Sequence, residues 1–152
     1  MSTTLDTTTI DLVRSSWAVV APNEAAVATL FYRHLLTLDP ALKPMFSGDM
    51  TVQGEKLMSM IGAALTLLDR PAQLVPVLRS LGGRHHGYGV RDAHYAVVGK
   101  ALLQTLQDGL AVAFTDEVRA AWTTVYGVLA AEMMAGAAAQ TPSVRLRQAL
   151  AA

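Results

Sequence analysis

Hydrophobic side chains recur along the chain with the period of an α-helix, and no segment alternates apolar and polar residues strictly over the length of a strand. Such a recurrence places apolar side chains on one face of each helix, where they pack into a shared core. The pattern therefore predicts an all-α protein. The expected helices cover about residues 10–20, 24–38, 40–46, 51–69, 72–86, 92–110 and 115–137.

Prolines and a capping residue indicate where some of these helices begin and end. Pro22 is expected to end the first helix, and Pro71 to break the chain between the fourth and fifth. Asp39 followed by Pro40 is typical of an N-cap and the first helical position, so a short helix begins there.

A length of 152 residues suits one domain with a sizeable core. Thr141 and Pro142 are expected to end the ordered fold. The prediction is a domain over residues 7–138 and a C-terminal tail over residues 139–152 that is flexible or weakly helical.

Composition narrows the classes of function. Hydrophobic residues make up 52% of the chain, and 12 lysines and arginines balance 12 aspartates and glutamates, so no nucleic-acid or membrane partner is indicated. The absence of cysteine excludes disulfides, cysteine zinc sites, iron–sulfur clusters and thiol catalysis. We find neither a secretory signal nor an apolar stretch of about 20 residues, so a cytoplasmic location is expected.

Two adjacent histidines are the first candidates for chemistry. Read as a helix, the segment has an apolar stripe made of Leu74, Leu78, Leu81 and His85. His86 falls on the mixed neighbouring stripe, as expected of a boundary or solvent position. His85 therefore points inward, either as a core histidine hydrogen-bonded to a carbonyl group or as the ligand of a metal-centred cofactor.

A glutamine on the preceding long helix is placed to face this histidine. Gln53 lies near the start of one helix and His85 near the end of the next, so antiparallel packing brings them to a similar depth. Gln53 shares its expected inward stripe with Leu57 and Ile61. The gap between these two helices would have one polar side chain on each wall, Gln53 and His85, and apolar residues elsewhere. Such a gap fits a flat cofactor bound through one axial imidazole.

These residues give the chain a resemblance to the globin family over about residues 7–137. The matching motifs are Phe31-Tyr32, Pro40 six residues before Phe46, Gln53 with Leu57 one turn on, Arg84-His85 followed by Val90, His94-Tyr95-x-x-Val98-Gly99 and Ala121-Trp122-x-x-x-Tyr126-Gly127. Within the family the chain is most similar to single-domain bacterial haemoglobins and to the haem domain of flavohaemoglobins. The resemblance implies the globin fold, a three-on-three helical sandwich around haem, with haem b (iron protoporphyrin IX) as cofactor.

The resemblance also implies roles for single residues. His85 would bind the haem iron while its other ring nitrogen donates to a carbonyl group or a side chain, and His86 would be exposed or at the haem edge. Ala28 and Gly54 would meet where two helices cross closely. Further cofactor contacts are expected from Phe46, Leu57, Ile61, Leu81, Val90 and Tyr95.

Tyr32, Gln53 and Leu57 would line the ligand-binding side of the haem. The resemblance implies that Tyr32 donates a hydrogen bond to bound oxygen and slows its release. Gln53 would supply a second donor or orient the tyrosine. Periodicity alone fits Tyr32 equally well as a core aromatic residue, and Gln53 as an ordinary polar residue at a helix start.

One residue of the flavohaemoglobin pattern is missing. Tyr95 resembles the tyrosine that neighbours the iron-bound histidine, where a glutamate of the last helix completes a hydrogen-bonded set. The corresponding residue here is Ala137, and Glu132 falls on a different turn. This departure argues against strong electron donation to the iron.

The resemblance leaves more than one function open. The leading expectation is reversible binding of oxygen, as in oxygen transport, and of other diatomic ligands such as nitric oxide and carbon monoxide. The alternative is nitric oxide dioxygenation with Tyr32 and Gln53 as catalytic residues. It needs a separate reductase, because the chain contains no Gly-x-Gly-x-x-Gly fingerprint. A gas or redox sensor is less favoured, and the oligomeric state stays open.

Overall fold

The computed structural model describes residues 5–46 and 48–151, with the side chains up to residue 139. Residues 1–4, Ser47 in an expected loop and Ala152 in the expected tail lie outside this description. Within it there is no strand, which confirms the all-α prediction, and no helix long and apolar enough to cross a membrane. The helices are α1 (Thr7–Val20), η1 (Ala21–Asn23), α2 (Glu24–Leu38), η2 (Pro40–Met45), α3 (Met50–Thr66), α4 (Pro71–Gly87), α5 (Asp92–Leu110), η3 (Ala111–Ala113) and α6 (Asp116–Ala151).

Aspartates begin three of these helices. Asp6, Asp39 and Asp49 are the N-caps of α1, η2 and α3, and each carboxylate accepts a hydrogen bond from a backbone N–H group of the first turn. Pro40 follows Asp39 at the first position of η2, as predicted. Local sequence therefore fixes where the chain turns from one helix into the next.

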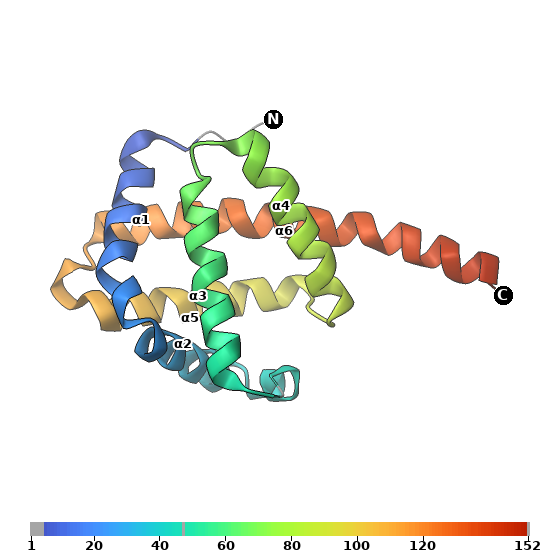
Figure 1. The fold of residues 1–152 in the computed structure, drawn as a ribbon, viewed down its shortest axis with the longest axis horizontal. Helices are drawn as coiled ribbons and strands as arrows, with labels where there is room; N and C mark the ends of the chain where they lie inside the picture. Colours follow the sequence, from blue (N-terminus) through green and yellow to red (C-terminus); the bar gives the residue numbers. More distant parts are fainter. Residues whose placement is uncertain (1–4, 47, 152) are drawn as a thin grey trace.

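The helices form two crossed layers. Figure 1 shows α1, α3 and α4 running across α5 and α6. The main contacts are between α4 and α6, α2 and α5, α1 and α6, and α2 and α3. This is the expected three-on-three arrangement, in which α3 and α4 pack chiefly on different partners.

Two tryptophans join α1 to α6 in the core. The rings of Trp17 and Trp122 lie 6.0 Å apart, and Trp122 is only 1% exposed. Its indole N–H group donates to the hydroxyl oxygen of Ser16 at 2.8 Å, and that hydroxyl donates to the carbonyl oxygen of Leu12 at 2.7 Å. The indole is therefore buried with its donor satisfied.

The buried face of α3 is displaced by one position from the predicted stripe. Its buried residues include Gly54, Met58 and Leu65, whereas the predicted inward residues are half-buried: Gln53, Leu57 and Ile61. The reason is the crossing with α2, where a Cβ atom on Gly54 would lie 2.8 Å from the Cβ atom of Ala28. This contact confirms the predicted close approach of Ala28 and Gly54 and turns the neighbouring stripe to a half-buried edge.

The last helix is longer than predicted. The sequence places its end near Ala137, yet α6 continues through Pro142 to Ala151, and its end extends beyond α4 in Figure 1. Alanine has the highest helix propensity, so the alanine-rich turns before Pro142 favour continuation. The predicted helix end was wrong, while the division into a domain and a tail stays a prediction.

Candidate functional site

His85 lies on the last turns of α4 and is half-buried. Its Nδ1 atom lies 2.7 Å from the carbonyl oxygen of Leu81. A carbonyl oxygen only accepts, so Nδ1 is the donor, and in the neutral imidazole the free lone pair is then on Nε2. This tautomer is the one that an imidazole uses when it binds a metal through Nε2.

The end of α4 holds the backbone of His85 in place. The N–H group of Val90 donates to the carbonyl oxygen of His85 at 3.0 Å, and that of Gly89 donates to His86 at 3.0 Å. Gly89 has a φ of 94°, a conformation that favours glycine. Together these contacts form a Schellman motif, which ends the helix at a glycine.

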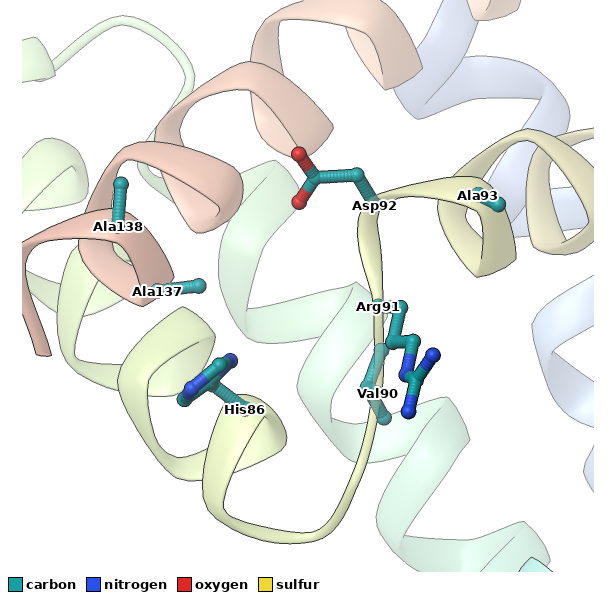
Figure 2. Close-up of a pocket in the computed structure, with 7 residues that line it drawn as sticks. All are labelled: His86, Val90, Arg91, Asp92, Ala93, Ala137 and Ala138. Atoms are coloured by element: carbon teal, nitrogen blue, oxygen red, sulfur yellow. The ribbon is translucent and has the colours of Figure 1, made fainter. Parts of the chain in front are cut away.

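His86 is exposed, as its mixed stripe predicts. It borders a groove of about 610 Å³ between the end of α4, the start of α5 and α6, drawn in Figure 2. Ala137 lines this groove from α6, and the carboxylate of Asp92 extends toward α6 from the start of α5. The carboxylate in this groove therefore comes from α5, and α6 contributes an alanine.

Tyr32 stands in a small aromatic cluster beside α3. Its ring centroid lies 5.3 Å from that of Phe31 and 5.3 Å from that of Phe46, both with edge-on geometry. Its hydroxyl donates to the backbone carbonyl oxygen of Gln53 at 3.3 Å. Burial raises the pKa of Tyr32, so the phenol stays protonated and acts as a donor at neutral pH.

Tyr95 is buried, and among the described residues its hydroxyl has no hydrogen-bond partner. Burial and the nearby charge of Asp92 raise the pKa of Tyr95, so this hydroxyl also keeps its proton. Its backbone carbonyl oxygen accepts a hydrogen bond of 2.6 Å from the hydroxyl of Tyr126. A buried, protonated and unpaired hydroxyl is rare in a folded protein and indicates a polar group that the chain itself does not provide.

The predicted site residues fall into two groups. Tyr32, Phe46 and Gln53 come together where α2, the end of η2 and α3 meet, while His85, Leu81 and Val90 belong to α4 and its exit. Half-buried apolar side chains occur in both groups: Phe46, Leu57, Ile61, Leu81 and Val90.

Sequence reasoning missed two glycines near this site. Gly82 precedes His86 by four residues and shares its mixed stripe, which predicts a boundary or solvent position, but Gly82 is buried against α6. Gly136 on α6 is packed in the same way against α4. A pair of consecutive glycines inside a helix, Gly82-Gly83, is the signal that could have indicated a close helix approach.

Comparisons with known proteins agree with this geometry. The family model described as Globin matches residues 29–133. The chain is 33% identical over 139 residues to a neuroglobin of Danio rerio, covering 82% of this chain and 87% of that protein. It is 34% identical over 122 residues to a flavohemoprotein of Bordetella parapertussis, covering 78% of this chain and 30% of that longer protein. The chain belongs to the globin family.

Solved structures extend the comparison. A hexacoordinated haem protein of an anhydrobiotic tardigrade superposes with a TM-score of 0.79 at 16% identity, covering 88% of this chain and 95% of that one, which shows the shared fold. An engineered carbene transferase, assigned as a nitric oxide dioxygenase from Rhodothermus marinus, gives a TM-score of 0.76 at 26% identity. That match covers 98% of this chain and 100% of the other.

Membership of the globin family implies haem binding, and the residues present fit a haem. His85 offers Nε2 as a ligand, Tyr95 has a buried hydroxyl without a partner, and the apolar residues expected to contact the cofactor are half-buried. No cluster of three His, Cys, Asp or Glu side chains that could hold a metal ion occurs in the described part of the chain. Haem iron requires only one such protein ligand in five-coordinate globins.

Proposed function

We propose that this globin binds haem b through His85 and reversibly binds oxygen and other diatomic gases on the side of Tyr32 and Gln53. The observation that carries the proposal is the hydrogen bond from Nδ1 of His85 to the carbonyl oxygen of Leu81, which leaves Nε2 available as a ligand. Haem supplies an iron to which a diatomic gas binds. The residues of the chain determine how the cofactor and the gas are held.

Tyr32 is the main hydrogen-bond donor in this proposal. Its phenol is protonated and oriented by edge-on contacts with Phe31 and Phe46. Its hydrogen bond to the carbonyl oxygen of Gln53 is long, at 3.3 Å, and is therefore a weak competitor for the proton. A polarised diatomic ligand that accepts this hydrogen bond is stabilised, and its release is slowed.

Gln53 and the apolar residues complete the ligand-binding side. Gln53 lies half-buried in the first turn of α3, where its side chain supplies a second donor or orients Tyr32. Phe46, Leu57 and Ile61 are half-buried apolar residues that would contact the cofactor and keep water away from the gas.

A second function is favoured by the relatives. The Rhodothermus marinus protein is assigned as a nitric oxide dioxygenase, and the flavohemoprotein of Bordetella parapertussis is similar to this chain over 30% of its own length. Dioxygenation of nitric oxide combines one nitric oxide, one oxygen molecule and one electron into nitrate. We propose that a separate reductase would supply that electron.

One experiment tests the first function and separates it from the second. The haem-reconstituted protein is reduced, titrated with oxygen and then mixed with nitric oxide in a stopped-flow instrument, with and without a cellular reductase. Oxygen uptake that reverses under vacuum supports reversible binding, and failure to take up oxygen contradicts it. Nitrate formation that continues only with the reductase supports the dioxygenase function, whereas a single turnover with no return of ferrous haem contradicts it.

A further inference from the structure

Helices α4 and α6 touch through their backbones at two glycines. A Cβ atom built on Gly82 would overlap the carbonyl oxygen of Met133, and a Cβ atom built on Gly136 would overlap the carbonyl oxygen of Arg79. In each contact, the hydrogen that glycine carries in place of a side chain points at a carbonyl oxygen of the opposite helix. The contacts are reciprocal, because each helix contributes one glycine and one carbonyl group spaced three residues apart.

An ion pair lies beside this crossing. The guanidinium Nε atom of Arg79 lies 2.9 Å from a carboxylate oxygen of Glu132. Arg79 therefore contacts α6 twice, through its backbone oxygen and through its side chain. The contact between α4 and α6 is also the most extensive between any two helices of the described chain.

The crossing lies within one turn of His85. Gly82 precedes His85 by three residues and directly follows Leu81, whose carbonyl oxygen accepts the hydrogen bond from the imidazole. Contact between two backbones has no flexible side chain that could absorb a displacement. Any change in the separation of α4 and α6 must therefore move the backbone that carries His85 and its orienting carbonyl group.

We propose that the Gly82–Gly136 crossing is a positioning device for His85, which sets where the imidazole stands relative to the haem iron. The inference rests on the proposed haem binding through His85. Gly82 and Gly136 act through the helix and are positioning residues. An added methyl group at either glycine forces α4 away from α6, so it changes the direction from which the imidazole approaches the iron.

The first test compares two alanine variants of the same helix. Gly136→Ala adds a methyl group at the crossing, while Gly127→Ala is the matched control, because a Cβ atom there meets nothing within 4 Å. We expect Gly136→Ala to shift the iron–histidine stretching frequency of the ferrous protein and to release haem about tenfold faster, because overpacking the crossing is destabilising. Gly127→Ala should match the wild type in both measurements.

A second control separates positioning from loss of stability. Ser16→Ala removes the hydrogen-bond partner of Trp122 at the far end of α6 and should destabilise the fold without moving α4. We expect Ser16→Ala to lower the melting temperature and leave the iron–histidine frequency unchanged. An equal frequency shift in Ser16→Ala and Gly136→Ala would overturn the proposal.

A further measurement does not depend on whether Gly136→Ala folds. His85→Gly supplied with free imidazole gives a haem ligand that is not attached to α4. Its iron–imidazole frequency should differ from the wild-type frequency, because the free ligand is not held by the crossing of α4 and α6. Identical frequencies in the wild type and the imidazole-supplied variant would overturn the positioning role. A wild type that binds no haem would instead overturn the proposed function.

Discussion

The hydroxyl of Tyr32 on α2 donates a hydrogen bond of 3.3 Å to the backbone carbonyl oxygen of Gln53 on α3. The two residues that the family resemblance assigns to the gas-binding side are thus adjacent in the fold, although 21 positions separate them in the sequence. The contact depends on the close crossing of α2 and α3 at Ala28 and Gly54. The same crossing therefore positions both Tyr32 and Gln53, the two polar residues assigned to the gas-binding side.

Replacing Tyr32 by phenylalanine tests whether its hydroxyl contacts the gas. Tyr32→Phe keeps the ring contacts with Phe31 and Phe46 and removes the donor. We expect the oxygen dissociation rate to rise by at least about tenfold, because one well-made buried hydrogen bond contributes about 1.4 kcal/mol. Stopped-flow displacement of oxygen measures the rate.

Tyr88→Phe is the control for this substitution. Tyr88 is 71% exposed and follows the end of α4, on the side of the site that carries His85. Its ring centroid lies 6.1 Å from that of His85. Tyr88→Phe should leave the oxygen dissociation rate unchanged. An unchanged rate in Tyr32→Phe would mean that the phenol serves only the contact with Gln53.

A methyl group at Gly54 should displace α3. The Cβ atom of Gly54→Ala would lie 2.8 Å from that of Ala28, so one helix must move. Overpacking of this kind costs about 1–3 kcal/mol, and it should also change the oxygen dissociation rate because α3 carries Gln53. Gly62→Ala on the same helix is the control, since its Cβ atom would lie 3.7 Å from Trp17, at ordinary contact distance. Equal stability of the two variants in urea denaturation would contradict the close crossing.

The buried hydrogen bond between Trp122 and Ser16 can be tested by removing one partner. Ser16→Ala leaves the indole N–H group of Trp122 buried without an acceptor, which costs about 1–3 kcal/mol of unfolding free energy. Ser15→Ala is the neighbouring control; this serine is exposed, so its replacement should change the unfolding free energy by less than about 0.5 kcal/mol. Urea denaturation measures both, and an unchanged unfolding free energy in Ser16→Ala would contradict the predicted contribution of this hydrogen bond.

The contact of Arg14 with Asp69, just beyond α3, should make the unfolding free energy depend on pH in the acidic range. Arg14 donates to the carbonyl oxygen of Leu65 at 2.8 Å and to the carboxylate of Asp69 at 2.9 Å. This contact holds the pKa of Asp69 below its ordinary value of 3.8. A lowered pKa stabilises the folded chain at pH values above the ordinary one, and the stabilisation is lost as pH falls from there through the lowered value.

Unfolding measured from neutral to acidic pH checks this dependence. The unfolding free energy of the wild type should fall more steeply in acid than that of Asp69→Asn, by a small amount because Asp69 is 54% exposed. Arg14→Gln should remove most of this difference, because Arg14 is the largest cause of the lowered pKa of Asp69. Parallel pH profiles of the wild type and Asp69→Asn would contradict the prediction.

Sequence pattern predicts the helices well where strong local signals bound them. The expected ranges 24–38 and 92–110 coincide with α2 and α5. The pattern fails where backbone contacts decide the packing. Glycine carries no hydrophobic side chain, so the pattern does not reveal the close helix approaches at Gly54 and Gly82. The family resemblance predicts the first of them and not the second.

In the candidate site, too, the sequence predicts some features and only the packed structure shows the others. The inward stripe indicates that His85 faces the interior, and the structure supplies the carbonyl group of Leu81 that sets its tautomer. The partner of Tyr32 could not be predicted, because it is a backbone atom placed by the crossing of α2 and α3. The unpaired hydroxyl of Tyr95 is likewise a property of the packed structure, invisible in the pattern.

The absorbance spectrum of the haem-reconstituted protein tests the central claim most directly, in the wild type, His85→Ala and His86→Ala. We predict a five-coordinate ferrous haem spectrum for the wild type and for His86→Ala, whose exposed imidazole lies beside the groove of Figure 2. His85→Ala should lose this signature or weaken it greatly. Retention of the signature in His85→Ala together with its loss in His86→Ala would contradict the assignment of His85 as the haem ligand.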